Sequence, residues 1–134
     1  MGLAPRVVSW TMNSKRDVGA VAELDVWQRS MDLVAEVYRL VDRLPARERF
    51  GLADQLRRAV ASIPANIAEG NARGHRREYV QFLTVARGSL AEVATHLESA
   101  RRVGYWGDTD LEIAGDLVRR TRQMLNRLIA SLSE

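Results

Sequence analysis

The stretch Ser62–Tyr79, SIPANIAEGNARGHRREY, joins two segments of helical periodicity and carries the strongest signals for the fold. Pro64 stands inside the first segment, where it removes one backbone donor and predicts a kinked helix. Gly70 or Gly74 supplies the predicted helix stop, because glycine readily adopts the left-handed conformation that follows many helix ends. Three arginines surround Gly74 and open the next helix. We therefore expect a kinked helix, a glycine stop and a basic helix start at one structural corner.

Apolar residues recur with the helical period in four segments, and no segment shows the alternation typical of a β-strand. The predicted helices are Asp25–Leu44, Gly51–Ala72, His75–Val103 and a fourth that opens with capping-box spacing at Thr109–Glu112 and runs to Leu132. The core stripe of the first is predicted to be Trp27, Met31, Val34, Tyr38 and Val41, widened by Leu33, Val37, Leu40 and Leu44. Short connections between four such helices predict an all-α, antiparallel up-down four-helix bundle.

The length of 134 residues and the amino-acid composition are typical of one globular domain. Residues 1–22 show no periodicity and are expected to be a disordered tail, which leaves residues 23–134 as the bundle domain. No apolar run is long enough to span a membrane. The absence of cysteine excludes disulfides and thiolate zinc sites, so the expected location is cytoplasmic.

Arginine dominates the basic residues, since only Lys15 is a lysine, and the formal net charge is +3. The planar guanidinium group suits phosphate, carboxylate and aromatic faces alike. The predicted nucleic-acid-binding residues are Arg73, His75, Arg76, Arg77, Arg57, Arg58 and Arg122. The alternative is that these arginines pair with the 17 acidic residues. Tyr105 and Trp106 are the paired aromatics expected to be partly exposed, so binding should depend on phosphate contacts rather than base stacking.

The second helix also carries a polar stripe, which consists of Gln55, Ser62, Asn66 and Glu69. It runs beside a stripe of alanines, and the pair suggests a helix covered on two sides, with the polar groups fixing register between subunits or helices. A solvated helix face is the alternative. The two histidines, His75 and His96, lie about 30 Å apart along one helix, so they cannot share a metal within one subunit. We expect no metal, no cofactor and no enzymatic activity.

Several segments stand in the order found in a known family. They are Leu24–Trp27, Gly51–Ala59, Ser62–Gly70, Phe82–Leu83, Ala86–Ser89 and Gly104–Tyr105. The chain resembles the bacterial four-helix-bundle proteins of 23S ribosomal RNA intervening sequences, a family that is similar to the accessory protein of diversity-generating retroelements. The resemblance implies a four-helix bundle, a ring-like homopentamer and no known enzymatic activity. For the retroelement relative it implies basic surfaces that face nucleic acid and a reverse transcriptase.

These observations favour a non-catalytic, homo-oligomeric bundle that binds nucleic acid, either RNA or an RNA–protein complex, through arginine-rich surfaces. The expected partners are further copies of the chain, RNA or DNA, and a nucleic-acid enzyme. The alternative is a protein–protein interaction scaffold that binds no nucleic acid. A third hypothesis, an enzyme that uses Gln55, Asn66 and Glu69, predicts that Glu69→Gln has a phenotype.

Overall fold

A computed structural model describes Val21 and residues 24–133. The helices in chain order are α2 (Asp25–Val41), the short 3-10 helix η2 (Ala46–Glu48), α3 (Leu52–Arg73), α4 (Arg76–Arg102) and α5 (Glu112–Leu132). No strand occurs in this described part of the chain, as the sequence predicts. The expected tail, residues 1–22, lies outside the described residues except for Val21, whose side chain is buried.

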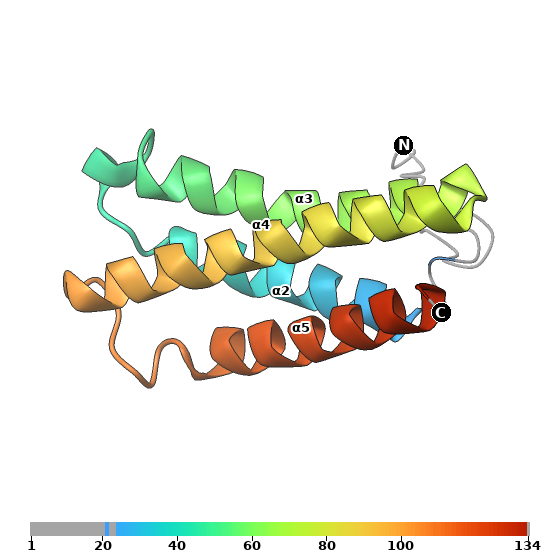
Figure 1. Cartoon of the computed structure of the whole chain (residues 1–134). Helices are drawn as coiled ribbons and strands as arrows, with labels where there is room; N and C mark the ends of the chain where they lie inside the picture. The colour runs from blue at the N-terminus through green and yellow to red at the C-terminus, as the bar shows by residue number, and fades with distance from the viewer. Residues whose placement is uncertain (1–20, 22–23, 134) are drawn as a thin grey trace, which may run out of the picture.

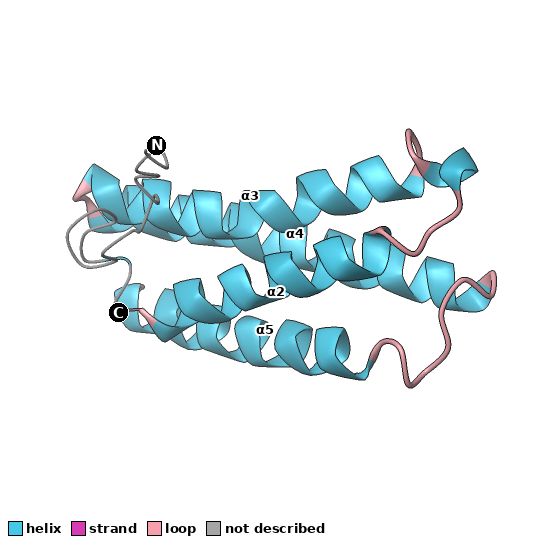
Figure 2. Cartoon of the chain, turned by 180° about the vertical axis from the view of Figure 1, so that it is seen from behind, coloured by secondary structure: helices cyan, strands magenta, loops and turns pink. Residues whose placement is uncertain are grey.

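The four long helices form a bundle in which successive helices run in opposite directions (Figure 1). α2 packs against α3 and α5, and α4 packs against the same two helices, so each helix has two neighbours. The view from behind shows the α2–α3 and α4–α5 connections at one end and the tight α3–α4 turn at the other (Figure 2). This arrangement confirms the predicted up-down four-helix bundle. The ring-like pentamer stays an expectation from the resemblance.

The two glycines of the opening stretch have separate roles at the α3–α4 turn. Gly74 follows the last residue of α3 with a φ of +77°, the left-handed conformation of a helix stop. Gly70 is buried inside α3, and a Cβ atom built on it would lie 2.7 Å from the Cβ of Phe82 on α4. Gly74 is therefore the stop, and Gly70 allows α3 and α4 to approach closely. α3 continues through Pro64, which is buried.

The core face of α2 differs from the predicted stripe. Met31 and Tyr38 are 38% and 43% exposed, whereas Ser30 and Glu36 are buried at 0% and 9%. The two polar residues are accommodated locally, since the Ser30 hydroxyl donates to the carbonyl of Trp27 at 2.8 Å and Glu36 accepts from Arg39 Nε at 2.9 Å. The core row is instead the widening set Leu33, Val37 and Leu40, all fully buried. Trp27 and Val41 of the predicted stripe are buried, so the prediction was wrong at Met31 and Tyr38.

Two helix ends also differ from prediction. α2 ends at Val41 rather than Leu44, because residues 42–44 form a turn before Pro45. α5 begins at Glu112 with Leu111 as its N-cap and no side-chain cap, so the predicted capping box is wrong. Asp110 explains the change, since its carboxylate accepts from the backbone N–H of Gly107 at 2.8 Å and from Arg43 at 3.1 Å. These contacts hold the connection in a turn until Leu111.

Trp106 corrects a further expectation, because it is only 2% exposed and belongs to the core. Its neighbour Tyr105 is half-buried, and its hydroxyl donates to Glu48 Oε2 at 2.6 Å. This hydrogen bond lowers the pKa of Glu48 and raises that of Tyr105. The α4–α5 connection is therefore tied to the bundle by a buried indole and to η2 by a charged hydrogen bond.

Candidate functional site

The predicted basic corner exists as a structural unit where α3 meets α4. His75 is the N-cap residue of α4, in extended conformation, and Arg76 and Arg77 form its exposed first turn. Arg73 ends α3, where its Nη2 lies 3.1 Å from Glu69 and its Nη1 lies 3.5 Å from Glu78. Its guanidinium carbon also lies 5.2 Å from the centre of the Phe82 ring. Arg73 is therefore engaged in the corner itself, whereas Arg77 on α4 has no ion pair with a described residue.

Arg57 and Arg58 do not join this corner. They lie about 24 Å of helical rise away from Arg73, near the other end of α3. Arg58 Nε lies 3.1 Å from the carboxylate of Asp54, and Arg57 lines a separate hollow of about 430 Å³ beside the α2–α3 connection. The structure therefore divides the predicted nucleic-acid-binding set between two ends of the molecule.

Arg122 lies on α5, which packs against α4, and its level is about 22 Å of helical rise from that of Arg76. Arg76 and Arg87 are about three turns apart and share one side of α4, while Arg122 and Asn126 are about one turn apart on α5. Arg87 Nη1 donates to Asn126 Oδ1 at 3.0 Å, so these two sides face each other. We call the four cations Arg76, Arg77, Arg87 and Arg122 the basic seam.

Few carboxylates lie near the basic seam. Residues 76–91 and 118–130 contain a single acidic residue, Glu78, which lies 3.5 Å from Arg73. Arg77 and Arg122 have no ion pair with any described residue, and Arg87 donates to the neutral Asn126. Elsewhere on α5, Arg119 and Arg120 both pair with Asp116. The charges of Arg77 and Arg122 are therefore not compensated by a described acidic residue, and Arg87 is a member of the seam that sequence reasoning missed.

The polar stripe of α3 is satisfied within its own helix. The Ser62 hydroxyl donates to the carbonyl of Ala59 at 2.8 Å, and Asn66 Nδ2 donates to the carbonyl of Ser62 at 2.7 Å. Glu69 pairs with Arg73, and Gln55 is exposed. In the described structure these four side chains do not converge on one point. Their role between subunits stays a prediction.

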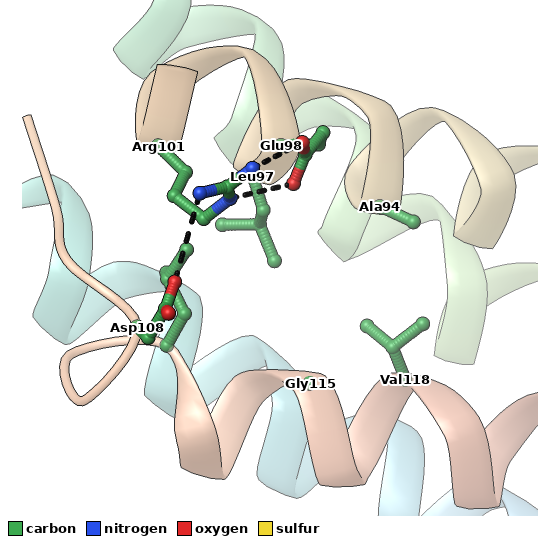
Figure 3. A pocket seen from close by; sticks show the side chains of 8 residues that line it. Ala94, Leu97, Glu98, Arg101, Asp108, Gly115 and Val118 are labelled. Atoms are coloured by element: carbon green, nitrogen blue, oxygen red, sulfur yellow. Dashed lines mark hydrogen bonds and ion pairs between the residues drawn. The ribbon is translucent and has the colours of Figure 1, made fainter. Parts of the chain in front are cut away.

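A cavity of about 250 Å³ opens between the C-terminal half of α4 and the start of α5 (Figure 3). Its floor is apolar, formed by Ala94, Leu97, Leu111, Gly115 and Val118. Small residues line both sides, Ala94 on α4 and Gly115 on α5, and nothing lies within 4 Å of a Cβ built on Gly115. We call this the α4–α5 pocket, and the sequence pattern did not predict it.

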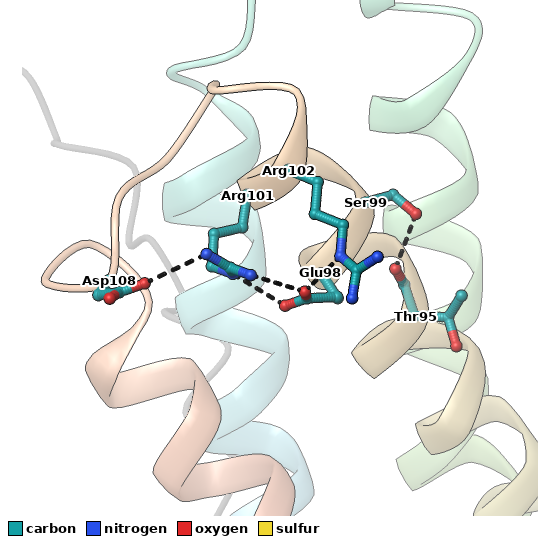
Figure 4. A network of polar contacts seen from close by, with 6 residues as sticks. All are labelled: Thr95, Glu98, Ser99, Arg101, Arg102 and Asp108. Atoms are coloured by element: carbon teal, nitrogen blue, oxygen red, sulfur yellow. Dashed lines mark hydrogen bonds and ion pairs between the residues drawn. The ribbon is translucent and has the colours of Figure 1, made fainter.

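Charged groups form the rim of the α4–α5 pocket (Figure 4). Glu98 accepts hydrogen bonds from Arg101 Nε at 2.9 Å and from Arg102 Nε at 2.8 Å, which lowers the pKa of Glu98 to about 2. Arg101 Nη1 also lies 3.7 Å from Asp108, whose side chain is 90% exposed. The pairing follows from the spacing of three and four residues, which places Glu98 and its two arginines together on one helix. It leaves Asp108 as the rim group most open to solvent.

Metal ligands do not gather in the described residues, since no group of three or more histidine, aspartate or glutamate side chains could hold an ion there. Within the same described part, no helix is long and apolar enough to cross a bilayer. His96 Nε2 lies 3.4 Å from Glu92, the spacing expected of a surface pair, but without hydrogen-bond geometry.

Comparisons with known proteins agree with the resemblance noted in the sequence. The family model described as 23S rRNA-intervening sequence protein matches residues 22–127. A solved crystal structure of a protein with unknown function from the S23 ribosomal protein family of Bacteroides thetaiotaomicron is similar, with a TM-score of 0.72 and 23% sequence identity. The similarity covers 78% of this chain and 97% of that one, and at this identity it supports the fold alone. No curated protein matches.

Proposed function

Because the chain belongs to the 23S rRNA-intervening sequence protein family, we propose that it is a non-catalytic, homo-oligomeric bundle that binds RNA or an RNA–protein complex through its basic seam. The family assignment rests on a match that spans most of the chain. The nucleic-acid part of the proposal rests on charge placement, and the homo-oligomer part rests on the resemblance described above. The relation to the retroelement accessory protein suggests a nucleic-acid enzyme as a further partner.

One observation carries the nucleic-acid proposal, namely the uncompensated charge at two positions of the basic seam. Many arginines elsewhere pair with acids, as Arg43 does with Asp110 and Arg101 with Glu98. Along the seam, Arg77 and Arg122 have no ion pair with a described residue. Uncompensated positive charge attracts a polyanion such as RNA, and binding is favoured because phosphate contacts release condensed counterions.

The geometry of the seam suits a phosphate backbone better than base edges. The α4 N-terminus adds a favourable dipole beside Arg76 and Arg77. Arg122 lies about one helical turn, roughly 6 Å, from the level at which Arg87 meets Asn126. No aromatic side chain of the seam itself offers a stacking platform, so affinity should come from charge, with little sequence preference.

A salt series tests this proposal with a matched pair of variants. Arg77→Glu with Arg122→Glu reverses two seam charges, and Arg57→Glu with Arg58→Glu reverses two charges at the far end of α3, so both lower the net charge equally. Binding to a labelled RNA hairpin and to a DNA duplex is measured from low to high salt, after co-purifying nucleic acid has been removed. The seam variant should reduce the slope of log K against log salt by about 2, about 1 for each arginine.

The control variant should keep the slope of the parent protein. If the slope falls equally in both variants, the interface lies elsewhere or binding depends only on the net charge of the protein. Absence of binding by the parent protein at low salt would overturn the nucleic-acid proposal.

One observation favours the second candidate, a protein–protein scaffold. Ala61, Ala65 and Ala72 are exposed along the outer side of α3, and such small side chains let another helix approach closely. If this candidate is correct, Ala65→Arg should disrupt association of the protein with its protein partner or with further copies of itself. Neither the parent protein nor the variant should bind nucleic acid. Sedimentation of this variant, alongside the salt series, separates the two candidates.

A further inference from the structure

Phe50 is a large apolar side chain that the fold of one subunit leaves unused. It lies in the α2–α3 connection and is 87% exposed, the highest exposure among the large hydrophobic residues described. Among the described residues its ring contact is with the neighbouring Arg49, whose guanidinium carbon lies 5.9 Å from the ring centre. An aromatic residue exposed to this degree at the tip of a connection is typical of an interface anchor.

The α4–α5 pocket is the matching unfilled feature, and it opens near the same end of the bundle (Figures 1 and 3). Its volume of about 250 Å³ exceeds the cavity of roughly 150 Å³ that accepts a benzene ring in another protein. The floor consists of aliphatic side chains and Gly115. It therefore fits a single aromatic side chain from outside.

Charge around the two features is complementary. Residues 103–118 carry four acids, Asp108, Asp110, Glu112 and Asp116, and no basic residue. Asp110 and Asp116 pair closely with arginines of the same subunit, whereas Asp108 lies 3.7 Å from Arg101 and its side chain is still 90% exposed. Glu112 has no ion pair with a described residue. On the other side, Arg49 next to Phe50 is exposed and has no such pair either.

We propose that Phe50 of one copy of this chain inserts into the α4–α5 pocket of the next copy, with Arg49 against Asp108 on the rim. The inference rests on the homo-oligomer part of the proposed function and not on its nucleic-acid part. Anchor and pocket occupy different surfaces, so the contact is heterologous: each copy donates Phe50 to one neighbour and accepts it from another. Repetition of such a contact produces a closed ring or an open filament.

Two variants remove the two halves of this contact without disturbing the core. Phe50→Ser removes the anchor, and Gly115→Leu fills the pocket, where a new side chain meets no atom within 4 Å of its Cβ. Each should weaken self-association by about thirtyfold or more, as expected for an aromatic hot spot. Sedimentation velocity on nuclease-treated protein measures the assembly, and circular dichroism confirms that each variant is folded.

The mixing experiment is the decisive test. In an equimolar mixture, the intact pocket of the Phe50→Ser protein accepts the intact Phe50 of the Gly115→Leu protein. The second contact in this pair is broken on both sides, so assembly should stop at a heterodimer. Either variant alone should not form this dimer.

Matched controls are Val103→Ser, which removes another exposed apolar residue near this end, and Gly88→Leu, which adds the same side chain on the outer side of α4. Both should associate like the parent protein. The inference is overturned if the Phe50→Ser and Gly115→Leu proteins keep the parent's mass, if their mixture forms no heterodimer, or if the parent itself is monomeric. The salt series on RNA is independent of these outcomes, so the two proposals fail separately.

Discussion

Replacement of Gly70 by alanine should destabilise the protein, although alanine is the better helix former. The added Cβ would lie 2.7 Å from the Cβ of Phe82 and 3.0 Å from Cδ1 of Tyr79. Comfortable carbon–carbon contacts are about 3.5–4.0 Å, so α3 and α4 must separate by about 1 Å at the turn. The Cβ of Phe82 is attached to the backbone and cannot rotate away.

Two opposing contributions determine how much Gly70→Ala changes the free energy of unfolding. Overpacking of this kind costs about 1–3 kcal/mol, and the change from glycine to alanine inside a helix recovers about 1 kcal/mol. We expect a net loss of about 1 kcal/mol in the free energy of unfolding. Gly88→Ala is the matched control, because it lies within α4 and nothing is within 4 Å of its Cβ. It should stabilise by about 0.5–1 kcal/mol, so the two changes have opposite signs.

Urea unfolding at fixed protein concentration, followed by tryptophan fluorescence, measures both effects. Trp27 and Trp106 are 8% and 2% exposed, so both change environment on unfolding. The two variants should differ by about 2 kcal/mol, or roughly 8 °C in Tm. If Gly70→Ala is as stable as Gly88→Ala, the close approach of α3 and α4 does not depend on Gly70 and the reasoning is refuted.

Three further predictions concern buried and paired groups. Thr121 is fully buried and its hydroxyl has no hydrogen-bond partner, so Thr121→Val should raise the free energy of unfolding by about 1 kcal/mol in the same urea experiment; a loss would mean that the hydroxyl is satisfied. Glu98, with a pKa lowered from 4.5 to about 2 by Arg101 and Arg102, stabilises the fold fully above pH 4.5 and loses this contribution as pH falls through 2. The stability curves of the parent and Glu98→Gln should converge over that window, and an NMR titration midpoint of this carboxyl near 4.5 would contradict the pairing. Trp106→Ala should cost about 3–5 kcal/mol, and a loss below about 1 kcal/mol would show that the α4–α5 connection is not anchored by its indole.

The sequence alone determined the helices and most of their ends. The period of apolar residues spans only three or four positions, and a glycine stop such as Gly74 acts through the local backbone. Both signals are readable without knowing what packs nearby. The charged pairs around Glu98 were predictable for the same reason, since their spacing along one helix places them together.

Only the tertiary structure determines which helix surfaces pack together, and therefore which residues are buried. α2 carries two apolar rows about one position apart, and only the neighbouring helices select Leu33, Val37 and Leu40 over Met31 and Tyr38. Periodicity could not place Trp106, because it lies in a connection, and the capping box at Thr109 lost to the contacts of Asp110.

The candidate site shows the same division. Arg73, His75, Arg76 and Arg77 share a corner because they are neighbours in sequence, so their grouping was predictable. Arg87 meets Asn126, and Ala94 and Gly115 line one pocket, only because the antiparallel register brings together residues far apart in the chain. A single sequence specifies each helix surface, but the packing of one surface against another determines the seam and the pocket.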